Sequence, residues 1–175
     1  MGQASLAVLS QGYGVPSTSD PQSFRVKALD EQGDWSPWRA VTRVMRLTQE
    51  TGGSPSVRYT GTWNVGARGE YSGGGIRHAS SVGRKASLRV KDATDLAWVT
   101  TKGPYRGKSE VWVDGVRKKI IDLYAPSLAY RQVVHATSFA SAGTHRIEVR
   151  VLGTRNPSSD GTRVDIDAFE SISLP

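Results

Sequence analysis

The 175-residue sequence contains no cysteine, which excludes a disulfide-stapled miniprotein, thiolate metal sites and thiol redox chemistry. It also has no long hydrophobic run, because no apolar stretch approaches the roughly 18 residues that a membrane-spanning helix needs. The apolar run near the start, residues 6–9, is too short for a signal peptide and lacks its basic flank. We therefore expect no membrane insertion and no export signal within this chain.

Acidic side chains are too few to balance the basic ones. The chain has 16 acidic and 23 basic side chains, which gives a net charge of +7. Residues 1–50 carry five of each sign, so the whole excess of +7 lies in residues 51–175. Such a charge favours polyanionic partners, among them nucleic acid, teichoic acid and uronate polymers.

Helix signals are scarce, and short alternating runs of apolar and polar residues dominate instead. Alternation is clearest at residues 24–28, 85–91 and 146–151, and each run predicts a strand with one buried and one solvent-facing side. Further strands are expected at residues 57–63, 76–80, 95–100, 131–137 and 163–172. Asp114 and Gly115 supply the positive φ angles of a tight hairpin turn between residues 110–113 and 116–124.

This spacing of short strands, with 19 glycines and 8 prolines between them, predicts an all-β fold, an antiparallel sandwich or barrel. Residues 48–56 contain no apolar side chain and are interpreted as a linker. The predicted organisation is therefore an N-terminal segment at residues 1–47, the linker, and a second domain at residues 57–175.

The N-terminal segment carries one resemblance. The run FRVKA at 24–28, followed by Asp30, Gly33 and WSPW at 35–38, resembles the last two strands of a fibronectin type III domain, the second being residues 39–47. A full sandwich of this kind needs roughly 90 to 100 residues. We therefore expect a partial fibronectin type III-like β segment and a chain that is a fragment of a longer polypeptide.

The second domain carries a more extensive resemblance. It rests on the following runs in order: YTGTW (59–63), YSGG (71–74), WVTTKGP (98–104), RGK (106–108), VWVDG (111–115), DLY (122–124), YRQV (130–133), GTH (143–145), GTRNP (153–157) and VDIDAF (164–169). They resemble a bacterial module that is similar to the galactose-binding-like jelly rolls of carbohydrate-binding modules. The resemblance implies a jelly-roll sandwich, a non-catalytic carbohydrate-binding or adhesive role, and an extracellular or cell-surface location.

Sugar-binding sites combine an exposed aromatic ring with a few fixed polar groups. The glycine-bounded loop at residues 100–108 and the loop at residues 124–131 supply both kinds of group. The predicted ligand-binding residues there are Lys102, Tyr105, Arg106, Lys108, Tyr124 and Tyr130. The alternative is a solvated loop whose tyrosines pack on neighbouring strands.

Trp112 is a further candidate for ligand binding. By alternation it shares a strand face with Glu110 and Asp114, opposite Val111 and Val113. Its ring could form a flat binding platform, or it could cover the edge of the sandwich. Two other tryptophans, at positions 63 and 98, sit in apolar runs and are expected in the core.

Asp165 and Asp167 stand two residues apart in a predicted strand, so their carboxylates are expected on one face, with Ile166 buried opposite. The family resemblance implies a structural calcium near the terminal strands, for which this pair is the candidate. Two carboxylates are few for a cation that takes six or more oxygens. The alternative is pairing with Arg163 or Arg58.

No catalytic motif is present. The three histidines, His78, His135 and His145, lie in separate predicted strands without metal-ligand spacing. The sequence has no nucleophile elbow, phosphate loop or dinucleotide fingerprint. We therefore predict that the chain is not an enzyme.

The leading hypothesis is a module that binds a polysaccharide or a cell-surface glycan and thereby tethers catalytic or surface domains of the same polypeptide. One alternative is a structural spacer or adhesin domain of a surface fibre or phage tail that binds protein. Another is a polyanion-binding surface formed by Lys85, Arg89, Lys91, Arg146 and Arg150. The absence of an aromatic-plus-basic recognition motif argues against nucleic acid as that polyanion.

Overall fold

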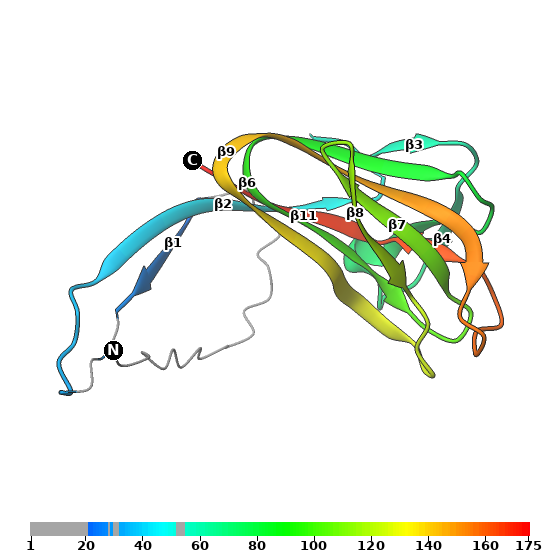
Figure 1. Cartoon of the computed structure of the whole chain (residues 1–175), viewed down its shortest axis with the longest axis horizontal. Helices are drawn as coiled ribbons and strands as arrows, with labels where there is room; N and C mark the ends of the chain where they lie inside the picture. The colour runs from blue at the N-terminus through cyan, green and yellow to red at the C-terminus, as the bar shows by residue number, and fades with distance from the viewer. Residues whose placement is uncertain (1–20, 28, 30–31, 52–54) are drawn as a thin grey trace.

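A computed structural model describes residues 21–27, 29, 32–51 and 55–175, and its named strand pairs are all antiparallel (Figure 1). The predicted all-β antiparallel sandwich is confirmed. The strands are β1 (Pro21–Val26), β2 (Arg39–Gln49), β3 (Arg58–Thr60), β4 (Asn64–Ala67), β5 (Gly75–Ala79), β6 (Lys85–Lys102), β7 (Gly107–Val113), β8 (Val116–Asp122), β9 (Ala129–Arg155), β10 (Val164–Ile166) and β11 (Ala168–Ser173), with one 3-10 turn, η1 (Ser72–Gly74). Within the described ranges, no helix has the length and apolarity to cross a membrane.

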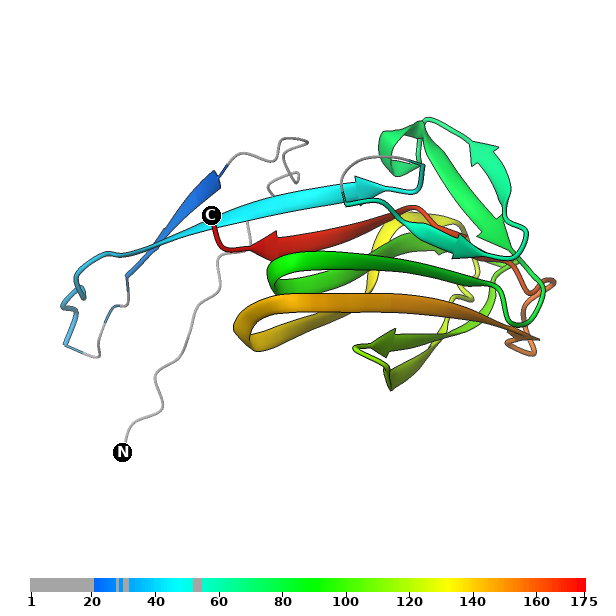
Figure 2. The same ribbon diagram turned by 90° about the horizontal axis from the view of Figure 1, so that it is seen from above.

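Two long strands, β6 and β9, connect the layers of the sandwich. The main sheet has the order β1-β2-β11-β6-β9-β7-β8, β3 also pairs with β6, and β10-β5-β4 form a small second sheet. The first part of β6 pairs with β3 and its later part with β11. Its register with β9 shifts between Val90 and Ala93, where Asp92 has a φ of 54°. Both strands double back there (Figure 2), so each passes from one layer to the other.

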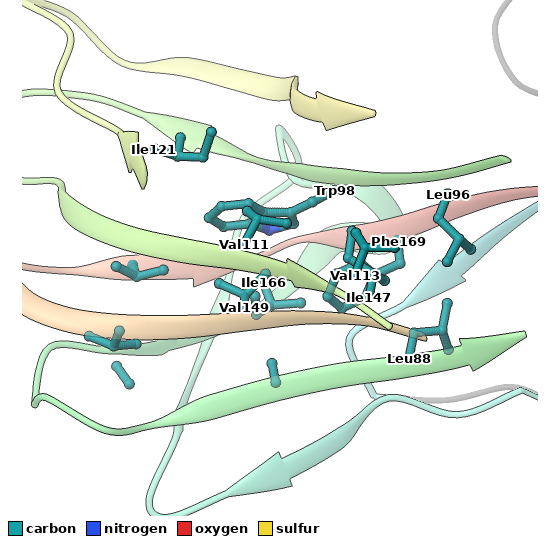
Figure 3. Packing of buried hydrophobic residues seen from close by; sticks show 14 of the residues in the cluster. Leu88, Leu96, Trp98, Val111, Val113, Ile121, Ile147, Val149, Ile166 and Phe169 are labelled. Carbon is teal, nitrogen blue, oxygen red and sulfur yellow. The ribbon is translucent and has the colours of Figure 1, made fainter. Parts of the chain in front are cut away.

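The core lies between these layers and follows the predicted alternation. In β6 Ala86, Leu88 and Val90 are buried, and in β7 Val111 and Val113 are buried on either side of the half-buried Trp112. The largest fully buried side chains include Trp98, Phe169, Ile147 and Ile166 (Figure 3). Burying one side chain of Leu or Phe size stabilises a fold by about 1.5–3 kcal/mol. The predicted core position of both Trp63 and Trp98 is confirmed.

The hairpin between β7 and β8 is confirmed at the predicted residues. Asp114 and Gly115 have φ angles of 51° and 79°, and Val113 pairs with Val116 on either side of them. Two successive positive φ angles match the right-handed twist of the flanking strands.

The N-terminal segment shares a sheet with the sandwich. β1 pairs with β2, and the last part of β2 pairs with β11, from Val44 opposite Ser173 to Gln49 opposite Ala168. The predicted linker at residues 48–56 therefore begins inside a paired strand, and Thr48 is buried there. The division of the chain into two domains stays a prediction. Residues 1–20, 28, 30–31 and 52–54, which include parts of the predicted segment and linker, lie outside the described residues.

Candidate functional site

Three loops meet at one end of the sandwich around residues 103–106. The Gly103 amide donates to the Leu123 carbonyl at 3.0 Å, and the Asp160 amide donates to the Pro104 carbonyl at 2.8 Å. Gly103 also forms an isolated bridge with Tyr124. The predicted ligand loop is therefore fixed by backbone contacts to the two loops beside it.

Ser159 holds the backbone on both sides of Tyr105. Its buried hydroxyl lies 2.9 Å from the Pro104 carbonyl, 2.7 Å from the Arg106 carbonyl and 3.0 Å from that of Gly161. Tyr105 itself is 57% exposed. The ring thus projects into solvent from a fixed backbone. Sequence reasoning missed Ser159, because a serine in a polar loop carries no pattern that marks it.

Lysine and tyrosine side chains surround this loop. Lys108 Nζ lies 3.8 Å from Asp122 Oδ2, which also accepts a 2.8 Å hydrogen bond from Asn156 Nδ2. The Tyr124 amide donates to Asp122 Oδ1 at 3.0 Å. Lys102, Lys108 and Tyr124 are all half-buried. Four of the predicted ligand residues are therefore gathered at this end: Lys102, Tyr105, Lys108 and Tyr124.

The side chains of the other three predicted ligand residues, Arg106, Tyr130 and Trp112, already contact other side chains of the protein. Arg106 is buried, and its Nη2 lies 2.8 Å from Asp165 Oδ2. This differs from the prediction that Arg106 donates to a ligand, because its guanidinium group is buried and already paired with a carboxylate. Tyr130 packs edge-on against Tyr71, with ring centroids 5.6 Å apart.

Trp112 lies on the outer face of β7, as alternation predicted. Its indole nitrogen donates to Glu110 Oε2 at 2.8 Å, and Arg117 Nη1 lies 2.9 Å from Glu110 Oε1. The Arg150 guanidinium carbon lies 3.7 Å from the centroid of the indole ring, a cation–π contact. One face of the expected platform is therefore covered by an arginine.

The predicted calcium pair does not fit a shared cation. Asp165 is buried between two arginines, with Arg106 at 2.8 Å from Oδ2 and Arg163 Nε donating to Oδ1 at 2.6 Å. Asp167 accepts from the Ser72 amide instead, at 2.8 Å. In the part of the chain that the structure describes, no three His, Cys, Asp or Glu side chains group as metal ligands. Pairing with Arg163, the alternative, is the arrangement observed.

Asp167 is a buried carboxyl group with one unsatisfied oxygen. Its Oδ2 has no hydrogen-bond partner among the described residues. Burial raises the pKa of Asp167 to about 7, with a further contribution from Glu50, while the Ser72 amide and Arg131 oppose the increase. Near neutral pH this group is therefore partly protonated.

No protein-family model matches the chain. One curated relative, an A type blood N-acetyl-alpha-D-galactosamine deacetylase of Flavonifractor plautii, is 28% identical over 94 residues, which cover 54% of this chain and 12% of the deacetylase. A Paenibacillus xanthan lyase superposes with a TM-score of 0.52 and 17% identity, over 67% of this chain and 12% of the lyase.

Two esterases give similar superpositions. A family two carbohydrate esterase from Cellvibrio japonicus has a TM-score of 0.53 at 15% identity, and a two-domain esterase active on acetylated mannans has 0.53 at 14%. Each match covers 75% of this chain, but only 34% and 37% of the respective esterase. The chain is an all-β sandwich that resembles domains of carbohydrate-active enzymes. It spans only a minor part of each of these proteins.

Proposed function

We propose that the chain is a non-catalytic carbohydrate-binding module that holds the domains attached to it at a polysaccharide or cell-surface glycan. The observation that carries this proposal is the exposure of Tyr105, at 57%, on a loop fixed by Ser159. A sugar ring presents an apolar C–H face that packs on an aromatic ring. A loop that is already ordered loses little entropy when it binds.

The lysines beside Tyr105 complete the proposed site. Lys102 and Lys108 are half-buried, and their ammonium groups can donate to hydroxyl or carboxylate oxygens. Asp122, one carboxylate in this cluster, is held by Lys108, Asn156 and the Tyr124 amide. These contacts support a positioning role for Asp122.

The comparisons support the ligand class. The similar proteins include a xanthan lyase, an esterase active on acetylated mannans and a deacetylase of an amino sugar, and this chain corresponds to only 12% to 37% of each. A small part of a larger glycan-active protein is the expected extent of an accessory module. The finer proposals are a galactose-binding-like jelly roll, a fibronectin type III-like N-terminal segment and an extracellular or cell-surface location.

The test is retention of the whole chain on a glycan array and on insoluble polysaccharides, at low and high salt. Tyr105→Ala is expected to weaken binding at least about fivefold, because a central aromatic contact typically contributes more than about 1 kcal/mol. Tyr105→Phe is the matched control, since it keeps the ring, and should bind nearly as the parent does. Equal retention of Tyr105→Ala would contradict the proposed site. No retention on any glycan would favour a structural spacer or adhesin.

A further inference from the structure

Several basic side chains gather on the outer face of β3, β6 and β9. Arg58 is paired with Ser87, and Ser87 with Glu148, so these three form one row across the strands. Two positions further along β6, Arg89 lies opposite Arg146 of β9 in the strand register. Side chains two apart in a strand point to the same face, so both rows lie on the side opposite the buried Leu88.

This face is hollowed into an open groove of about 800 Å³. Four of its eight lining residues are basic and none is acidic. The eight lining residues are Pro55, Ser56, Arg58, Ser87, Arg89, Lys91, Thr144 and Arg146. A second hollow of about 300 Å³ shares Pro55, Arg89 and Lys91 with the first and adds Arg46. The basic groove therefore continues toward the bend of β6.

The charges in the groove are poorly compensated within the protein. Arg58, Arg89 and Lys91 are exposed, and no ion pair is found for them among the described residues. Arg146 contacts Glu148, but Arg150 shares that carboxylate at 2.5 Å. Like charges directly opposite each other in a sheet are destabilising, as at Arg89 and Arg146. A bound anion between these two guanidinium groups would remove the repulsion.

We propose that this basic groove binds an acidic polysaccharide, independently of the Tyr105 loop. Carboxylate or sulfate groups would lie on Arg58, Arg89, Lys91 and Arg146, since guanidinium groups bind such anions through paired N–H donors. The exposed Ser56 and Thr144 line the same groove, and their hydroxyl groups can bind sugar hydroxyls. The Ser87 hydroxyl instead accepts from Arg146 Nη2 at 3.2 Å.

The lining favours a polysaccharide over nucleic acid. Single-stranded nucleic acids are bound by stacking their bases on aromatic rings. Among the residues that the structure describes, no aromatic side chain lines the groove, and the nearby Trp112 ring is covered on one face by Arg150. Of the five basic residues predicted to form a polyanion surface, Arg89, Lys91 and Arg146 line the groove, and Lys85 and Arg150 do not.

The experiment measures binding of the whole chain to polygalacturonate oligomers and to heparin oligosaccharides by calorimetry, at 50 and 300 mM salt. Neutral mannan and a single-stranded oligothymidine serve as comparison ligands. The variant is Arg58→Gln with Arg89→Gln, and the matched control is Lys118→Gln with Lys119→Gln, an equal charge change at exposed positions of β8 outside the groove. Thermal unfolding of each variant checks that the fold is kept.

We expect at least tenfold weaker binding of the acidic glycans by the arginine variant and less than threefold weakening by the lysine control. Binding should fall steeply with salt. Tyr105→Ala should leave it unchanged. The proposal is overturned if both charge variants weaken binding equally, if neither acidic glycan binds, if Tyr105→Ala abolishes the binding, or if oligothymidine binds more tightly through the same arginines.

Discussion

Arg106 and Asp165 form a buried ion pair that connects the Tyr105 loop to the core. Arg106 Nη2 lies 2.8 Å from Asp165 Oδ2, and the two side chains are 5% and 0% exposed. Removing one partner of a buried pair leaves an uncompensated charge and typically costs about 3–5 kcal/mol. Asp165→Asn is therefore expected to lower the free energy of unfolding by about that amount, measured by urea denaturation.

The control for this prediction replaces both partners. Arg106→Leu with Asp165→Leu removes the two charges together, and such replacements are often neutral or stabilising in buried sites. Arg163 still carries a charge in that variant, but its side chain is 29% exposed and can be solvated. An Asp165→Asn protein within about 1 kcal/mol of the parent would show that the pair does not hold the loop.

The burial of Arg106 against Asp165 could not be predicted from the sequence. A glycine-bounded loop suggested an exposed Arg106. A Cβ added at Gly107 would lie 2.3 Å from the Thr162 carbonyl oxygen, so this glycine lets a distant loop approach closely and cover the arginine. Its partner, Asp165, is far away in the sequence, and no local pattern relates the two residues. The exposure of Tyr105 followed from its immediate neighbours and is confirmed, whereas its contact with a ligand stays a prediction.

The fold shows a similar division between local and distant information. Alternation predicted separate strands at residues 85–91 and 95–100, and both lie in the single strand β6. The interruption in alternation marks the bend at Asp92, with its φ of 54°, and not the end of a strand. The predicted strand at residues 163–172 is instead divided between β10 and β11. Which strands pair across the sandwich depends on contacts that alternation within one strand does not report.

The hairpin turn gives a second prediction. Gly115 has a φ of 79°, and an added Cβ would meet no atom within 4 Å. The cost of Gly115→Ala is therefore conformational alone, and we expect a loss of about 1–2 kcal/mol in the free energy of unfolding. Gly69→Ala is the matched control, because that position is equally open and has no positive φ. Equal stability of the two variants would contradict the proposed turn strain.

The third prediction concerns Asp167. Burial raises its pKa to about 7, Glu50 and Asp165 add to this, and the Ser72 amide and Arg131 oppose it. An unfolded aspartate has a pKa of about 3.9, so between pH 4 and 7 the native state binds a proton that the unfolded state does not. Stability attributable to this group is present below about pH 4 and is lost as the pH rises to about 7.

Asp167→Asn should remove this pH dependence. The amide oxygen can still accept from the Ser72 amide, and no charge is buried at neutral pH. We expect a flatter profile of unfolding free energy between pH 4 and 7 and greater stability than the parent at pH 7.5, at about 1.4 kcal/mol for each unit of pKa difference. Urea denaturation at four pH values measures both. Asp160→Asn is the control, because Asp160 is exposed. If the pH profile of Asp167→Asn runs parallel to that of the parent, the raised pKa of Asp167 is refuted.

The last prediction separates the position of Tyr105 from its contact with a ligand. The Ser159 hydroxyl lies 2.9 Å from the Pro104 carbonyl oxygen and 2.7 Å from the Arg106 carbonyl oxygen. Ser159→Ala removes the donor, and we expect a loss of about 1 kcal/mol in unfolding free energy.

If a fixed loop is needed for glycan binding, Ser159→Ala should also weaken retention on polysaccharide several-fold, although Ser159 is buried and cannot touch the ligand. Ser158→Ala is the matched control, because Ser158 is the exposed neighbour. Its backbone amide donates a hydrogen bond to Asn156 Oδ1, and this bond does not involve the hydroxyl. Unchanged retention of a destabilised Ser159→Ala protein would mean that glycan binding does not depend on how the Tyr105 loop is held, since the variant loosens the loop and leaves the tyrosine in place.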